Sequence, residues 1–91
     1  MNNCPVIGLL YCFKPVHKED IVWLSNTAKK SGIIILKKDC DDIFLLTRVD
    51  NNSFNKNWST FYFLLNSQTY KLSNISVGTF NLYFKEINNE T

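Results

Sequence analysis

The positions of the apolar residues along the chain predict mostly β-strands, with one stretch that repeats at helical spacing. Short apolar runs rich in β-branched and aromatic residues, bounded by turn-forming residues, are typical of strands. Thr79–Ile87 alternates most regularly, with Phe80 and Phe84 on one face and Tyr83 and Lys85 on the other. The strands that this pattern predicts are Pro5–Phe13, Ile33–Leu36, Ile43–Val49, Trp58–Leu65, Thr69–Leu72 and Thr79–Ile87.

One helix is predicted between the first two of these strands, over residues 18–30. Ile21, Leu24 and Ala28 recur at the spacing of one buried helix face. Two acidic residues open the stretch and two lysines close it, an arrangement that the helix dipole favours. Gly32 follows at the place where a left-handed C-cap is needed. The pattern therefore indicates an amphipathic helix of about 14 residues.

These elements in chain order, β-α-β-β-β-β-β, predict a single α+β domain over residues 1–91. A strand, a crossover helix and a second strand form a right-handed βαβ unit, so the first two strands are expected to be parallel. The later strands follow one another through polar turns and are expected to pair antiparallel. We expect a single helix packed on one face of a mostly antiparallel, curled sheet of five to six strands.

The second face of such a sheet poses a packing problem. A helix of about 14 residues is ~21 Å long and strands lie ~4.8 Å apart, so the helix covers about four strands on one face only. The first four predicted strands carry apolar residues on both faces. The sheet must therefore curl on itself, or it must bury the second face against another molecule.

The composition is that of an ordinary globular protein, with 45% apolar and 20% charged residues. No apolar run approaches the ~20 residues that a membrane-spanning helix needs. The N-terminal residues lack the basic region and the cleavage site of a signal peptide. We therefore expect a cytoplasmic protein without a membrane partner.

The charge balance gives little support for nucleic-acid binding. The net charge is +2, and it comes from nine lysines and a single arginine, Arg48. Arginine is the residue that contacts phosphates and guanines bidentately, so its scarcity argues against a nucleic-acid partner. The abundance of Asn, Ile, Lys, Phe and Tyr is typical of AT-rich coding and indicates an accessory or phage gene.

Cys4, Cys12 and Cys40 are an odd number of cysteines without CxxC spacing, which predicts reduced, unpaired thiols and no zinc site. Cys40 lies in an acidic turn, whose charges are expected to raise the pKa of its thiol. Nothing in the sequence brings His17, the only histidine, together with a cysteine or serine nucleophile and an orienting acid. We therefore expect no catalytic residues and no enzyme activity.

Asp39, Asp41 and Asp42 gather enough carboxylates to suggest a calcium or magnesium site. The stretch lacks the glycine and the final glutamate of the EF-hand loop, so we expect neither a metal nor another cofactor. Contact with a basic partner surface is the better interpretation of this cluster, because opposite charges steer association.

Phe54, Lys56 and Trp58 place two large aromatic residues in or beside a polar loop. Such aromatics either anchor a protein interface or fold back onto the core as a lid, and the sequence leaves both open. Tyr83 and Lys85 share a face of the last predicted strand, where bases could stack.

The function that these observations favour is that of a small non-catalytic binding protein that inhibits a protein partner. An immunity protein, an antitoxin or a phage-encoded inhibitor fits, with a toxin or a defence enzyme as the partner. The alternatives are a small ribonuclease toxin or RNA-binding protein, and a structural subunit that completes its core as a homo-oligomer. The predicted partner-binding residues are Asp39, Asp41, Asp42, Phe54, Lys56, Trp58, Tyr83 and Lys85.

Overall fold

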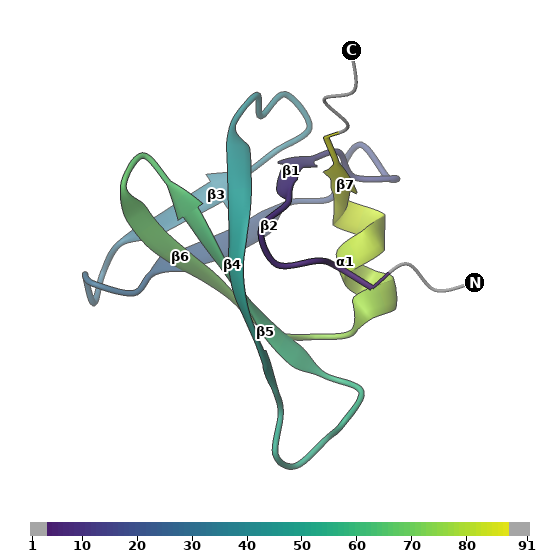
Figure 1. Cartoon of the computed structure of the whole chain (residues 1–91). Helices are drawn as coiled ribbons and strands as arrows, with labels where there is room; N and C mark the ends of the chain where they lie inside the picture. The colour runs from purple at the N-terminus through teal and green to yellow at the C-terminus, as the bar shows by residue number, and fades with distance from the viewer. Residues whose placement is uncertain (1–3, 88–91) are drawn as a thin grey trace.

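The computed structural model describes residues 4–87, which form seven strands and one short helix (Figure 1). The remaining residues of the predicted 1–91 domain lie outside this range. No helix of the described part is long and apolar enough to span a membrane. The elements are β1 (Leu10–Phe13), β2 (Val22–Asn26), β3 (Ile33–Leu36), β4 (Ile43–Asn51), β5 (Ser59–Leu65), β6 (Gln68–Ile75), α1 (Val77–Tyr83) and β7 (Phe84–Glu86).

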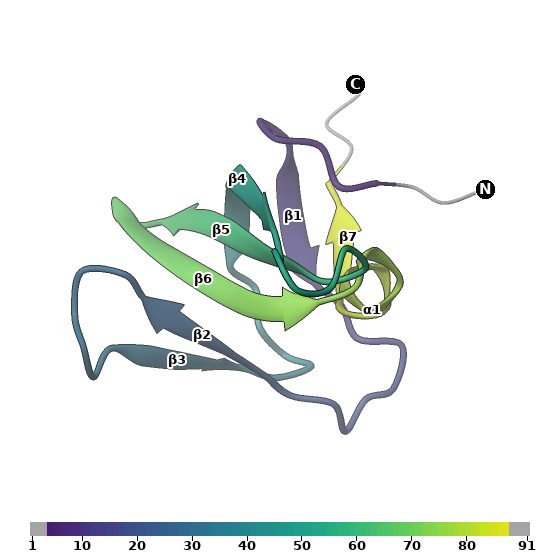
Figure 2. The same cartoon turned by 90° about the horizontal axis from the view of Figure 1, so that it is seen from below.

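All seven strands belong to one sheet in the order β3-β2-β6-β5-β4-β1-β7, and every pairing is antiparallel. The sheet curls strongly, and α1 packs beside β7 near one end of it (Figures 1 and 2). The expected α+β class and the curled sheet are therefore confirmed. The inner, concave face holds the core, and the outer face remains uncovered by any described element.

Aromatic side chains dominate the core. Phe80 of α1 lies at its centre, with its ring centroid 4.5 Å from that of Phe61 and 5.0 Å from that of Phe84. Buried aromatic pairs of this kind contribute about 0.5 to 1.5 kcal/mol each beyond their buried area. The largest fully buried side chains are Phe13, Phe44, Phe61, Phe63, Phe80, Phe84, Leu24, Leu36 and Leu46.

The helix predicted over residues 18–30 is wrong, because this stretch contains β2 and its flanking turns. Val22 and Leu24 are buried while Trp23 between them is exposed, which is the two-residue alternation of a strand. The side-chain oxygen of Asn26 accepts a hydrogen bond from the Ala28 N–H at 2.8 Å, which turns the chain out of the strand. Gly32 permits close approach: a Cβ there would lie 2.8 Å from the Cβ of Asn26.

The predicted parallel pair of strands is also wrong. The strand expected at Pro5–Phe13 forms only over its last four residues, as β1, which pairs with β4 and β7, whereas β3 pairs with β2. With no crossover helix between them, nothing requires β1 and β3 to be parallel neighbours. The sheet has seven strands rather than five to six because β2 adds one to the predicted set.

The strand predicted at Thr79–Ile87 is wrong over most of its length, because α1 occupies its first half and β7 is short. Ser76 caps the helix: its hydroxyl oxygen accepts a hydrogen bond from the Thr79 N–H at 3.1 Å. Phe80 and Phe84 are both buried at a spacing of four residues. Tyr83 therefore ends a helix and does not share a strand face with Lys85.

The strands predicted at Ile43–Val49 and Trp58–Leu65 are confirmed as β4 and β5. Phe61 and Phe63 point into the core, as expected, and Tyr62 and Leu64 lie on the outer face. In these two strands, buried and less buried residues alternate along the chain, so the sequence was enough to predict their positions.

Candidate functional site

A group of exposed apolar side chains lies at one edge of the sheet. Trp23 is 58% exposed, Ile33 51% and Ile35 49%. Trp23 of β2 pairs directly with Ile35 of β3, and both point to the outer face. Ile21, also half exposed, precedes β2. We call Ile21, Trp23, Ile33 and Ile35 the β3 edge surface; curling leaves it open to solvent.

The backbone of β3 is open on the same side. The Asn26 N–H donates to the Gly32 carbonyl at 2.6 Å, so this facing pair is hydrogen bonded. In an antiparallel ladder, hydrogen-bonded facing pairs alternate with pairs that are not hydrogen bonded. The backbone N–H and C=O groups of Ile34 therefore point to β2, and those of Ile33 and Ile35 point away from it. The described sheet ends at β3 (Figure 2). These backbone groups can therefore pair with an added strand.

The two edges of the sheet differ in how they are protected. β7, at the opposite edge, has three residues and carries Lys85 and Glu86, features that discourage strand addition. β3 has no charged residue within it. Lysine pairs lie just before it, at 29–30, and just after it, at 37–38, and none of these four makes an ion pair within the described chain. The β3 edge is thus apolar in its middle and basic before its start, whereas Lys37 and Lys38 after its end are followed by Asp39, Asp41 and Asp42.

The predicted acidic residues lie beside the end of this edge strand. Asp39, Asp41 and Asp42 are exposed in the connection from β3 to β4. Asp39 and Asp42 border a groove of about 400 Å³ whose other walls include Leu36 and Tyr70. The described residues contain no group of three or more acidic, histidine or cysteine side chains placed to hold a metal ion. Contact of the acidic residues with a basic partner stays a prediction.

Cys4, Cys12 and Cys40 are free thiols in the structure. Cys40, in the acidic turn, is half-buried, and its Sγ donates to Asp42 Oδ2 at 3.8 Å. Burial raises the pKa of this thiol above the ordinary 9.0, and the charges of Asp42 and Asp41 raise it further. The expected direction is confirmed, with burial as the largest cause.

Cys40 is therefore expected to react with iodoacetamide more slowly than an unfolded cysteine at the same pH, because the thiolate is the reactive form. In a variant with Cys4→Ser and Cys12→Ser, the rate should reach half its plateau above pH 9.0 when folded. The unfolded chain loses this proton first, so the same shift lowers stability as the pH rises through 9.0. Equal midpoints in buffer and in urea would contradict the prediction.

The aromatic loop is far from the acidic turn. Phe54 is 99% exposed and Trp58 46%, so Phe54 does not fold onto the core as a lid. Lys56, between them, is also exposed. The Asn52 side chain holds this loop by accepting from the N–H groups of Phe54 at 2.7 Å and Asn55 at 3.0 Å. The loop and the acidic turn lie at opposite ends of β4, which at nine residues is ~30 Å long.

Tyr83 and Lys85 occupy a third region. Tyr83 is half-buried, and its ring stacks on that of Phe13 with centroids 6.2 Å apart. The Lys85 ammonium donates to the Asn81 carbonyl at 2.6 Å. The structure therefore spreads the predicted partner-binding residues over three regions. The β3 edge surface, which the sequence reasoning missed, carried one signal: an isoleucine run between two lysine pairs.

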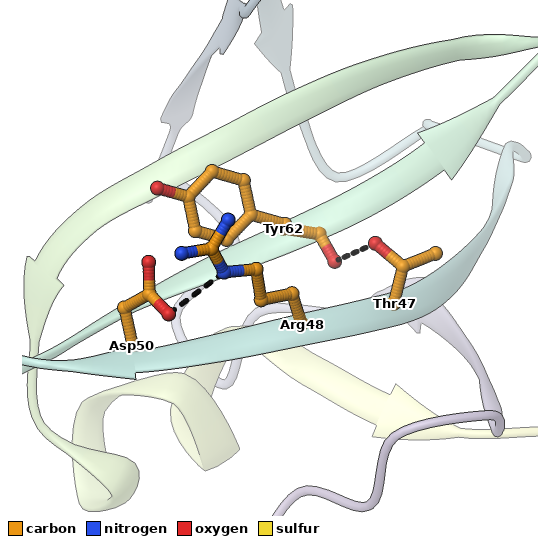
Figure 3. A network of polar contacts seen from close by, with 4 residues as sticks. All are labelled: Thr47, Arg48, Asp50 and Tyr62. Carbon is orange, nitrogen blue, oxygen red and sulfur yellow. Dashed lines mark hydrogen bonds and ion pairs between the residues drawn. The ribbon is translucent and has the colours of Figure 1, made fainter.

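A row of polar and aromatic side chains crosses the middle of the outer face. Lys71 of β6, Tyr62 of β5 and Arg48 of β4 are direct cross-strand neighbours. The Arg48 guanidinium lies 5.2 Å from the centre of the Tyr62 ring, and its Nε donates to Asp50 Oδ1 at 2.8 Å (Figure 3). A bulge at Thr47 sets this register, and the Thr47 hydroxyl donates to the Tyr62 carbonyl at 3.2 Å.

The groups available to the ribonuclease alternative divide among three places. His17 and Glu19 are exposed in the connection from β1 to β2, and Arg48 and Lys71 lie on the outer sheet face. Tyr83 and Lys85, the remaining two, lie at the end of α1 and in β7. The described side chains form two exposed surfaces: an apolar strand edge, and a row of cations around a tyrosine. No protein-family model, no curated protein and no solved structure matches this chain.

Proposed function

We propose that this protein is a non-catalytic binding module that inhibits a protein partner by receiving an extended partner segment along β3. The observation that carries the proposal is the open backbone of Ile33 and Ile35 beneath exposed apolar side chains. Added strands gain affinity from main-chain hydrogen bonds and specificity from alternate side chains. A toxin or a defence enzyme held in this way would be the inhibited partner.

The chemistry of the edge defines the segment that fits it. Ile33 and Ile35 offer apolar contacts in the middle of the strand, and Trp23 provides a large ring beside them. Tryptophan is among the residues that most often dominate interface energies. Lys29 and Lys30 favour acidic residues at the end of the partner segment that lies beside them, whereas Lys37 and Lys38 are followed by three aspartates and favour neither sign. The expected occupant is an extended chain with alternating apolar residues and an acidic flank at one end.

Pairing between two copies of this chain is the alternative use of the same edge. Antiparallel pairing of β3 with β3 of a second copy, centred on Ile34, would bring Lys30 close to Lys38, and like charges at facing positions are destabilising. The same pairing would bring Lys29 close to Asp39, a pair of opposite charges. The oligomeric state of the free protein therefore has to be measured, and the proposal expects a monomer.

A matched pair of variants tests the proposal in a pull-down from the source cells. Trp23→Ser with Ile35→Ser is expected to weaken binding of the captured protein by about 30-fold or more, since a central interface residue contributes about 2 kcal/mol or more. Phe54→Ser with Trp58→Ser, in the distant loop, should leave it unchanged. Light scattering of the free protein should show a monomer.

The captured partner is then assayed alone and with excess protein. Loss of its activity with the wild type, and retention of that activity with the edge variant, is the expected result. Full activity in the bound state would refute inhibition. Unchanged binding by the edge variant, or loss of binding in the loop variant alone, would refute the β3 edge as the docking surface.

A further inference from the structure

A basic groove of about 650 Å³ lies on the outer face, between the β2–β3 hairpin and the middle of the sheet. It adjoins the β3 edge surface, because its lining residue Ser25 pairs with Ile33, but none of Ile21, Trp23, Ile33 and Ile35 lines it. Three lysines and a tyrosine give it its character, and none of the described residues that line it is acidic. The lining residues are Ser25, Asn26, Thr27, Ala28, Lys29, Lys30, Tyr62 and Lys71.

The groove continues across the strands as a row of donors. Ser25 pairs with Lys71, Lys71 with Tyr62, and Tyr62 with Arg48. Strands lie ~4.8 Å apart, so this row spans ~14 Å from Ser25 to Arg48. The hydrogen bond from the Thr27 N–H to the Thr69 carbonyl, 2.9 Å, holds the hairpin against β6 at the end of the row. The cations are therefore positioned by paired strands.

The charges in the groove are free to bind a ligand. Lys29, Lys30 and Lys71 form no ion pair within the described chain. Arg48 is paired with Asp50 through Nε alone, which leaves its two terminal nitrogens as donors. Lysines that line a groove without carboxylates attract a polyanion. A polyanion bound here would also contact the Tyr62 ring, which lines the same groove.

We infer that this groove binds single-stranded nucleic acid. Phosphates contact Lys29, Lys30 and Lys71, and a base contacts the Tyr62 ring, the combination that sequence-tolerant single-strand binders use. The scarcity of arginine argues against reading of base edges, but lysine suffices for backbone contacts. The Arg48 guanidinium lies 5.2 Å from the centre of the Tyr62 ring, and bases stack on guanidinium planes as well as on aromatic rings. The carboxylates of an acidic protein would satisfy the lysines but would not stack on this pair. Lys29 and Lys30 also flank the β3 edge, so the two proposals share these lysines, whereas Lys71 and Tyr62 belong to this one alone.

Fluorescence anisotropy with a labelled oligo(dU) or oligo(dT) of about 15 nucleotides tests the inference. The wild-type protein should bind at micromolar concentration near 50 mM salt. Three neutralised phosphates predict a slope of about −2 in log affinity against log salt, at about −0.7 for each phosphate on a single strand. No anisotropy change up to about 100 μM protein would overturn the inference.

Variants locate the binding on the groove. Changing Lys29, Lys30 and Lys71 to glutamine should weaken binding by about tenfold or more and flatten the salt slope. Tyr62→Ser should weaken it by about 5- to 100-fold, and Tyr62→Phe should retain it. The matched control changes three exposed lysines outside the groove, Lys14, Lys18 and Lys56, to glutamine and should bind as the wild type does. An equal loss in this control would indicate diffuse attraction and overturn the inference.

Two further measurements test whether the groove prefers nucleic acid to an acidic protein, and whether its binding depends on the β3 edge surface. Polyglutamate that competes as well as the oligonucleotide does would assign the groove to an acidic protein and overturn the inference. The edge variant with Trp23→Ser and Ile35→Ser should keep its nucleic-acid affinity, so failure of the protein-partner proposal leaves this one standing. Thermal melting of each variant confirms that the fold is intact.

Discussion

Replacing Phe80 with alanine is expected to lower the free energy of unfolding by about 3 to 5 kcal/mol, the usual cost of removing a fully buried phenylalanine. Phe80 is the contact between α1 and the sheet: its ring lies 5.4 Å from Tyr11, 4.5 Å from Phe61 and 5.0 Å from Phe84, measured between centroids. A domain of this size has a total stability of about 5 to 15 kcal/mol. Urea unfolding followed by circular dichroism measures the loss.

Two controls separate the core contact from a general effect on the helix. Leu82→Ala changes a half-exposed residue of the same helix and should cost less than about 1 kcal/mol. Phe80→Leu retains most of the apolar volume and should lie between the two, at about 1.5 kcal/mol. If Phe80→Ala costs no more than Leu82→Ala, α1 does not complete the core in the way described.

The central strands could be predicted from the sequence because their signal is local. In β5 the residues at 59, 61 and 63 are buried and those between them are not, so the alternation alone defines the inner face. The same holds for Phe44 and Leu46 in β4. A curled sheet could also be predicted, because the predicted strands carry apolar residues on both faces and one helix covers only one face.

The position of the helix could not be predicted, for two physical reasons. Val22, Trp23 and Leu24 have the alternating burial of a strand, but the charges on both sides imitate a capped helix. The true helix, α1, has seven residues, too few to show a helical period against the alternation of its sequence. Its start is set by the Ser76 cap, and its place is set by burial of Phe80 in the aromatic core.

The two proposed binding surfaces, the β3 edge surface and the basic groove, depend on the order of the strands in the sheet, which local sequence patterns do not predict. Trp23 and Ile35 are exposed because the order of the strands and their register place both side chains on the outer face of the sheet. Tyr62 meets Arg48 only because the bulge at Thr47 shifts the register of β4 by one residue. Residues that are distant in sequence become one surface through pairings that local patterns cannot reveal.

Proline substitutions at two neighbouring positions of β3 are expected to separate stability from binding. Ile34 pairs with Leu24, and the ladder directs its N–H at β2. Ile34→Pro removes this donor and leaves a partly buried carbonyl without its partner, so it should cost about 2 to 4 kcal/mol. Thermal unfolding should show a clear fall in Tm.

Ile35→Pro changes the adjacent residue, whose N–H points away from β2 to the open edge, where proline is tolerated. It should cost about 1 kcal/mol or less, and the variant should fold. Because the same N–H is the donor that an added partner strand would use, partner binding should nevertheless be lost. A larger loss of stability in Ile35→Pro than in Ile34→Pro would show that the N–H of Ile35, not that of Ile34, points to β2. Retained binding by a folded Ile35→Pro protein would show that the partner contacts side chains of the edge without adding a strand to it.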